Sequence, residues 1–186
     1  MRLPILYCCL FFLLGASSCI ILGNVKSDYR RLTAEQKARI STTTFPIDSL
    51  SYDENIYVVN TQQIKEFFAA HDSTLLYNWF GACVGINYLP WLERYCQEHS
   101  LALCVFMRTF YWPTMPPKGV ITTPILFVDP RPYNTKSSIR QNRLMYMDLT
   151  GFDYETVKQL QLKSNFIIFH RDRFDRSIDN PHWALE

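Results

Sequence analysis

The strongest constraint on the fold is an alternation of short apolar runs and helical segments between residues 55 and 128. Apolar runs of strand length occupy 56–59, 74–80, 101–107 and 125–128. Ile64 and Phe68 recur at helical spacing after the first run, and a second helix is expected after Gly81, ending near Glu98. Such alternation predicts parallel strands joined by helical crossovers.

The second half of the chain predicts a change in sheet geometry. Residues 142–149 are expected to form a strand beside 125–128, and the absence of a helix between them predicts an antiparallel hairpin. Asp153 is expected to begin a helix that ends near Leu162, and the run 166–169 is one more strand or a sheet edge. The pattern therefore predicts an α/β fold: one domain with a mixed sheet flanked by helices.

Composition supports a folded domain and narrows the class of ligand. Hydrophobic residues make up 48% of the chain and aromatic residues 15%, which is enough for a packed core. The formal charge is only +2 and there is no basic cluster, so the chain gives no reason to expect nucleic acid. The four histidines are scattered and none has metal-ligand spacing with a cysteine. We therefore expect neither a metal nor another cofactor.

The N-terminus predicts export. Arg2 precedes an apolar run from Leu3 to Leu14, and the small residues 15–18 come directly before Cys19. A basic start, an apolar run of this length and a small-residue zone are the parts of a secretory signal. The arrangement resembles the lipobox of bacterial lipoproteins, although Ala16 stands where that family usually has leucine. The resemblance implies cleavage just before Cys19 and attachment of a lipid to that cysteine.

Two other interpretations of the N-terminus remain open. Residues 3–23 are uncharged and long enough to stay uncut as a membrane anchor, or Cys19 is incidental and the protein is secreted. We expect a lipoprotein of the cell envelope that faces the periplasm, because no acidic residue directly follows Cys19. The predicted organisation is a signal peptide at 1–18, a lipid-anchored tether at 19–54, a domain at 55–163 and a C-terminal extension at 164–186, whose polar tail from Arg171 is a surface segment.

The middle of the chain resembles the active-site region of the thioredoxin-like family. In that family a buried strand ends in a tryptophan, and the nucleophilic cysteine of a CxxC motif follows four residues later at the start of a helix. Trp79 and Cys83 have this spacing, and Pro90 stands seven residues after Cys83, where extracytoplasmic members often have a proline. Thr123-Pro124, before an apolar run, resembles the cis-proline segment that faces the cysteine in the family.

This resemblance covers about residues 55–163 and implies a thioredoxin-like fold with a defined site. The candidate nucleophile is Cys83, and the groups expected to contact a protein or peptide substrate are Trp79, Ala82, Thr123 and Pro124. The motif is degenerate because Ile86 replaces its second cysteine, so an intramolecular dithiol–disulfide cycle cannot run through it. A helix N-terminus lowers the pKa of a thiol placed there, which favours a single nucleophile that forms mixed disulfides.

The remaining cysteines of the domain do not replace the missing one. Cys96 lies 13 residues beyond Cys83 in the same predicted helix, which separates them by about 20 Å, beyond the reach of a disulfide. Cys104 lies within an apolar strand, and we expect both Cys96 and Cys104 to be buried structural thiols.

Three classes of function stay open, and whether the chain is an enzyme stays open with them. The first is a thioredoxin-like lipoprotein that acts on partner thiols through Cys83. The second is a non-catalytic binding or assembly lipoprotein on the same fold. It would use its sheet edges and the aromatic loop 110–113, which either forms a contact surface or covers the sheet. The third is a structural envelope protein without this fold.

Overall fold

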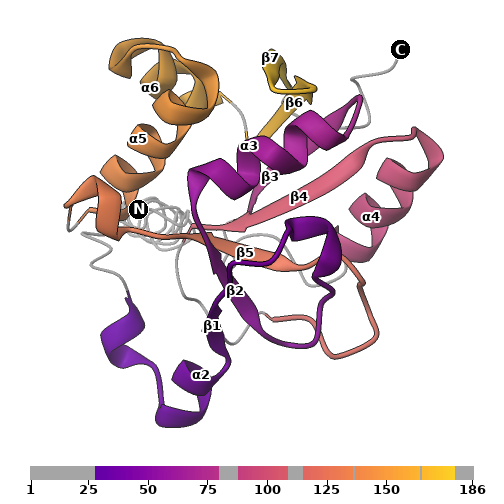
Figure 1. Ribbon diagram of the computed structural model, residues 1–186, viewed down its shortest axis with the longest axis vertical. Helices are drawn as coiled ribbons and strands as arrows, with labels where there is room; N and C mark the ends of the chain where they lie inside the picture. The colour runs from indigo at the N-terminus through magenta and orange to yellow at the C-terminus, as the bar shows by residue number, and fades with distance from the viewer. Residues whose placement is uncertain (1–27, 80–87, 109–114, 136, 164, 179–186) are drawn as a thin grey trace, which may run out of the picture.

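The computed structural model describes residues 28–79, 88–108, 115–135, 137–163 and 165–178. In these residues a mixed sheet of seven strands is flanked by helices (Figure 1). The strands are β1 (Ile40–Thr42), β2 (Ile56–Val59), β3 (Thr74–Trp79), β4 (Ala102–Met107), β5 (Ile125–Val128), β6 (Phe166–His170) and β7 (Arg173–Ile178). The helices are α2 (Ala34–Ala38), α3 (Thr61–Ala70), α4 (Tyr88–Glu98), α5 (Ser138–Thr150) and α6 (Tyr154–Lys163), with 3-10 turns η1 (Asp28–Arg31), η2 (Ile47–Ser49) and η4 (Arg131–Tyr133). The predicted α/β class, a single domain with a mixed sheet flanked by helices, is confirmed.

The strands lie in the order β1-β2-β5-β4-β3-β6-β7. Neighbours from β1 to β3 are parallel, whereas β6 is antiparallel to β3 and β7 is antiparallel to β6. The register places Trp79 beside Met107 and Val105 beside Ile125. Because parallel strands end at the same edge of a sheet, the carboxyl ends of β2, β5, β4 and β3 meet at one edge.

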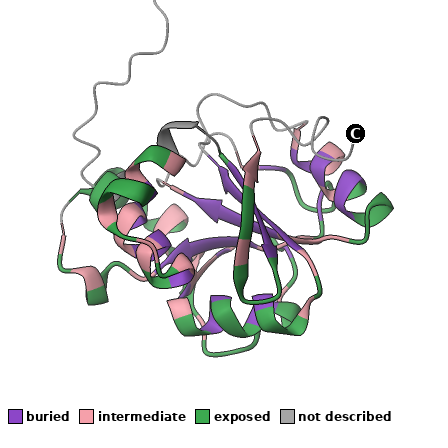
Figure 2. Ribbon diagram, turned by 90° about the horizontal axis from the view of Figure 1, so that it is seen from above, coloured by how far each residue is buried: buried purple, intermediate pink, exposed green. Residues whose placement is uncertain are grey.

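Helices cover both faces of the sheet, and the buried residues concentrate in the strands between them (Figure 2). Side chains alternate along β3, so that Leu75, Tyr77 and Trp79 pack against α4. Leu76 packs on the opposite side with residues of α3, α5 and α6, and Asn78 shares that side. We call these two sides the α4 face and the α5 face. Strands covered on both faces read as continuous apolar runs, which is why the runs at β3, β4 and β5 were recognisable.

A capping box begins α3 and also fixes the N-terminal segment. Asn60 Oδ1 accepts from the Gln63 backbone N–H at 2.9 Å, and Gln63 Oε1 accepts from the Asn60 N–H at 3.0 Å. The Gln63 side chain also donates to the carbonyls of Thr43 and Phe45. The side chain of Gln63 therefore helps to cap α3 directly after β2, and it ties residues 43–45 to the domain.

Residues 142–149, predicted as a strand, form part of helix α5, so that prediction is wrong. Ser137 Oγ accepts from the Arg140 backbone N–H at the start, and Gly151 ends the helix with a left-handed φ of 73°. The buried positions recur at helical spacing, at Gln141, Asn142, Met145, Tyr146 and Leu149. Two of these five carry amides, so the apolar pattern alone hides the helical period.

The predicted antiparallel hairpin between 125–128 and 142–149 is also absent. β5 is parallel to both of its neighbours, and the hairpin of the described sheet is β6–β7. The run 166–169 is confirmed as a strand. The polar tail from Arg171, expected to be a surface segment, continues into the edge strand β7, whose residues are exposed or half-buried. The range predicted as a C-terminal extension thus adds two strands to the sheet.

Part of the range predicted as a tether also packs onto the domain. Leu32, Ile47 and Tyr52 are buried, and β1 pairs in parallel with β2. The predicted signal peptide and Cys19 lie outside the described residues. Among those described, no helix has the length and apolar character needed to cross a membrane.

Candidate functional site

The predicted reactive cysteine belongs to the connection between β3 and α4. Trp79 ends β3, and Ala82 and Cys83 lie in the segment 80–87, outside the described residues. The described residues show the end of β3, where this connection begins, and the start of α4, where it ends. The Arg108 backbone N–H donates to the Trp79 carbonyl at 3.1 Å, which extends the pairing of β3 and β4 to the carboxyl edge. The roles of Ala82 and Cys83 stay predictions.

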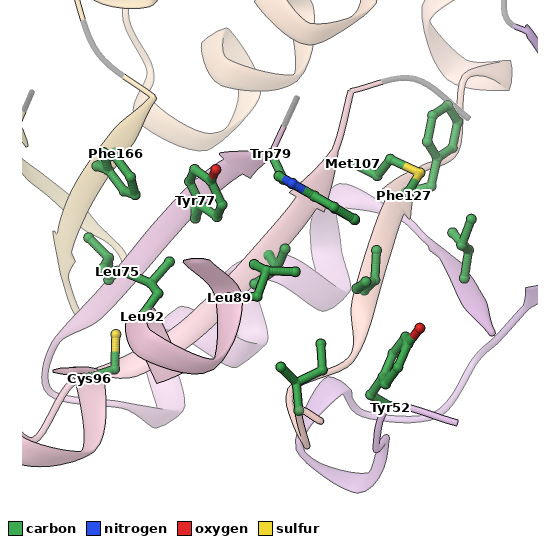
Figure 3. Close-up of a cluster of buried hydrophobic side chains, with 14 of the residues drawn as sticks. Tyr52, Leu75, Tyr77, Trp79, Leu89, Leu92, Cys96, Met107, Phe127 and Phe166 are labelled. Atoms are coloured by element: carbon green, nitrogen blue, oxygen red, sulfur yellow. The ribbon is translucent and has the colours of Figure 1, made fainter. Parts of the chain in front are cut away.

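Trp79 is a core residue. Its side chain is 1% exposed and lies among buried side chains on the α4 face, beside Tyr77, Leu89 and Met107 (Figure 3). Burial of an indole of this size is a large apolar contribution to stability. Trp79 therefore holds the end of β3 in place, and its predicted contact with a substrate stays a prediction.

Thr123 and Pro124 are not brought next to Trp79. They precede β5, which β4 separates from β3, and the register places Ile125 beside Val105 rather than beside Met107. With about 4.8 Å between strands and about 3.3 Å per residue, Pro124 lies about 10 Å across and about 10 Å along the sheet from Trp79. Pro124 thus stands at the amino end of its strand, whereas Cys83 follows the carboxyl end of β3.

The Thr123–Pro124 peptide bond is trans, because the described residues contain no cis bond, and the predicted cis-proline is wrong. Its neighbourhood is organised by Glu93 of α4. Glu93 Oε1 accepts from the Thr123 N–H at 2.7 Å and the Thr123 hydroxyl at 2.8 Å. The same oxygen accepts from the N–H and hydroxyl of Thr122. A peptide can pair with the Thr123 N–H only by displacing Glu93, and the predicted substrate contacts of Thr123 and Pro124 stay untested.

Glu93 is a residue that the sequence does not reveal. Burial alone would raise the pKa of its carboxyl, but the hydrogen bonds from Thr122 and Thr123 outweigh burial and lower that pKa below its usual value. Glu93 is therefore ionised at neutral pH and joins α4 to the start of β5. A single carboxylate in a helix forms no sequence motif. The pair of threonines at 122–123 was the feature of the sequence that could have indicated a hydrogen-bonding partner for it.

Cys96 and Cys104 are confirmed as buried, unpaired thiols. Cys96 is a residue of α4 and packs onto the α4 face of the sheet, whereas Cys104 lies in β4 and points to the α5 face, so the sheet lies between the two thiols. Burial raises the pKa of Cys96 to about 12 and raises the pKa of Cys104 well above its ordinary value. Both thiols are therefore protonated at neutral pH and poor nucleophiles.

The described residues contain no cluster of histidine, cysteine, aspartate or glutamate suited to a metal ion. In comparisons with known proteins, no family model, curated protein or solved structure matches the chain. The class that the structure itself defines is a single α/β domain with helices on both faces of a mixed sheet. Any function must therefore be argued from the residues of this chain.

Proposed function

We propose that the chain is a membrane-anchored lipoprotein whose thioredoxin-like domain acts on the thiols of a partner protein through Cys83 alone. The observation that carries this proposal is the state of the other two cysteines of the domain. Cys96 and Cys104 are buried on opposite faces and protonated at neutral pH, so thiol chemistry is left to Cys83. Cys83 lies in the connection that joins the carboxyl end of β3 to α4.

The proposed reaction needs no second cysteine in the chain. The Cys83 thiolate attacks one sulfur of a partner disulfide, a new S–S bond forms, and the other partner sulfur leaves as a thiolate. A thiolate from a second protein or a small thiol then attacks the mixed disulfide and releases Cys83. The lipid on Cys19 would hold the domain in the cell envelope, where disulfides form and persist.

Alkylation of the thiols against pH tests this proposal. The chain is prepared with Cys8, Cys9 and Cys19 replaced by serine, so that only Cys83, Cys96 and Cys104 can react. We expect one thiol to react in the native protein, with a pKa below about 8.5, and this reaction to vanish in Cys83→Ser. The matched variants Cys96→Ser and Cys104→Ser should leave it unchanged. A native protein in which no thiol reacts until it unfolds would contradict the proposal.

A non-catalytic binding or assembly lipoprotein is the second candidate. The carboxylate of Glu93 favours it, since it occupies the Thr123 N–H that was expected to meet an extended peptide. The two candidates differ in what Cys83→Ser does to partner capture in the envelope. Loss of reducible adducts supports thiol chemistry, whereas equal capture by Cys83→Ser and the unsubstituted chain supports binding alone.

The anchor has its own test. We expect the chain to incorporate labelled fatty acid, and Cys19→Ala to lose both the label and the recovery of the domain in the membrane fraction. Membrane recovery of Cys19→Ala without label would instead identify the N-terminal run as an uncut anchor.

A further inference from the structure

Within the described residues, four side chains keep a polar atom buried without a hydrogen-bond partner, and one of them, Thr74, stands at the amino end of β3. The other three belong to the α5 face toward the carboxyl ends of the strands. Their unpartnered atoms are Oδ1 of Asn78, Nδ2 of Asn142 and Nε of Arg143. Asn78 is 3% exposed and Asn142 is 8% exposed. Leaving one such atom unsatisfied is destabilising, and native proteins retain few of them. We therefore considered which group these three atoms could bind.

Asn78 lies at the carboxyl edge of the sheet, next to the position of Arg108. Asn78 is the penultimate residue of β3 and pairs with Phe106, which packs on the α5 face. Two residues after Phe106, Arg108 continues the pairing through its N–H bond to the Trp79 carbonyl. Strand alternation directs the Arg108 side chain to the α5 face, so Asn78 and Arg108 are diagonal neighbours there.

Helix α5 brings the other two groups to the same edge. The Gln141 side chain donates to the carbonyl of Val128 at 2.9 Å, which fixes the first turn of α5 over the carboxyl end of β5. Asn142 follows directly, one helical turn before the buried Tyr146. The guanidinium of Arg143 is held at one end, since its Nη1 donates to the Tyr154 hydroxyl at 2.8 Å.

The electrostatics of this edge are positive. Burial lowers the pKa of the Arg108 guanidinium, Tyr146 raises it, and the neighbouring Arg143 lowers it further. Two guanidinium groups that repel each other in a poorly hydrated place are stabilised by an anion. The position also lies at the carboxyl ends of the parallel strands, the edge at which open α/β sheets bind ligands.

We propose that Asn78, Arg108, Asn142 and Arg143 form a binding site for one small phosphate group. Arg143 Nε and Asn142 Nδ2 donate to its oxygens, and Arg108 supplies the second positive charge. Asn78 Oδ1 is an acceptor, so it selects an anion that still carries a hydroxyl, which hydrogen phosphate has and a carboxylate lacks. This site is separate from Cys83 and does not depend on thiol chemistry.

Calorimetric titration of the full-length chain, purified in mild detergent, with inorganic phosphate tests the proposal. We expect saturable binding of phosphate, and weaker binding of acetate than of phosphate. Phosphate should also raise the unfolding temperature of the protein above its value in chloride of equal ionic strength. Arg143→Gln should weaken the phosphate affinity about 10- to 100-fold, since it removes a charged donor. The matched control is Arg140→Gln, which removes the same charge from an exposed position of α5 and should leave the affinity unchanged.

A second variant keeps the test decisive if Arg143→Gln does not fold. Asn142→Leu removes an unpartnered amide, so the free protein should be at least as stable as the unsubstituted chain while its phosphate affinity falls. A phosphate monoester is mostly doubly ionised at neutral pH and then has no hydroxyl to donate, so we expect it to bind more weakly than inorganic phosphate, which identifies free phosphate as the ligand. Equally tight binding of the monoester would overturn the selection of a hydroxyl by Asn78 Oδ1. Failure of phosphate to exceed chloride, or equal losses in Arg143→Gln and Arg140→Gln, would overturn the proposal and leave ordered water as the occupant.

Discussion

Along β3, Leu75, Tyr77 and Trp79 face α4, whereas Leu76 and Asn78 face α5. On the α4 face the buried groups are apolar or aromatic, as in the stack of Tyr77 on Phe166 at 4.7 Å between ring centroids. Within the described residues, the buried side-chain atoms without a partner all belong to the α5 face, at Thr74, Asn78, Asn142 and Arg143. Both faces carry an apolar core. Since unsatisfied buried atoms lower stability, their restriction to the α5 face points to a retained binding site there, whereas the described α4 face is satisfied throughout.

Trp79→Ala gives the largest expected effect and tests the α4 face. Because the indole is 1% exposed, its removal should lower the free energy of unfolding by about 3–5 kcal/mol, measured by urea titration. Phe45→Ala is the control, since Phe45 is 68% exposed, and should change stability by less than about 0.5 kcal/mol. Similar losses for the two variants would show that Trp79 is not a core residue of the α4 face.

Glu93→Gln tests a polar group of α4 that has hydrogen-bond partners, in contrast to the unpartnered atoms of the α5 face. We expect a loss of about 1–3 kcal/mol at pH 7, because one oxygen accepts four hydrogen bonds from Thr122 and Thr123. Glu98→Gln, at an exposed position of the same helix, should be neutral.

The same carboxylate predicts a pH dependence. The pKa of Glu93 is lowered in the folded protein, so its stabilisation is present above the unfolded value of about 4.3 and is lost as the pH falls through the folded value. Urea titrations between pH 7 and acid should show the advantage over Glu93→Gln shrinking in that window. An advantage that is constant with pH would show that the ionised form is not what the threonines stabilise.

Asn78→Leu has the smallest expected effect and the opposite sign. On the α5 face the substitution removes an unpartnered oxygen, so the free energy of unfolding should stay equal or rise by about 1 kcal/mol. Leu76→Asn, the neighbouring position on the same face, should instead destabilise by several kcal/mol, because it buries a new amide. If Asn78→Leu were as destabilising as Leu76→Asn, Asn78 would be an ordinary structural residue.

The part of the fold that could be predicted was the part with a simple apolar pattern in the sequence. The runs at β3, β4 and β5 are buried on both faces and could be recognised as strands, whereas α5 was mistaken for a strand because Gln141 and Asn142 interrupt its apolar face. Strand order could not be read in the same way. The position of β5 between β2 and β4 depends on pairings between residues far apart in the chain, which leave no local pattern.

The candidate site divides in a similar manner. Cys104 could be predicted to be buried because apolar residues surround it in the sequence, and Cys96 because free cysteine is among the residue types most often buried. The placement of Thr123-Pro124 could not, because it came from a resemblance in short motifs, and Glu93 holds those threonines through bonds that no motif encodes. Asn78 and Arg143 gave no signal for the same reason, since they lie 65 positions apart in the sequence, in β3 and in α5, and no local motif relates them.

The most direct test of the difference between the two faces is a high-resolution crystal structure of the chain. The crystals are grown with phosphate at a concentration that saturates the site, as judged from the affinity measured in solution. We expect tetrahedral density at the carboxyl edge on the α5 face, within hydrogen-bond distance of Arg143 Nε and Asn142 Nδ2, and no such density in Arg143→Gln. Density for water alone at that edge, with phosphate present at saturating concentration, would contradict the assignment of a binding site to the α5 face.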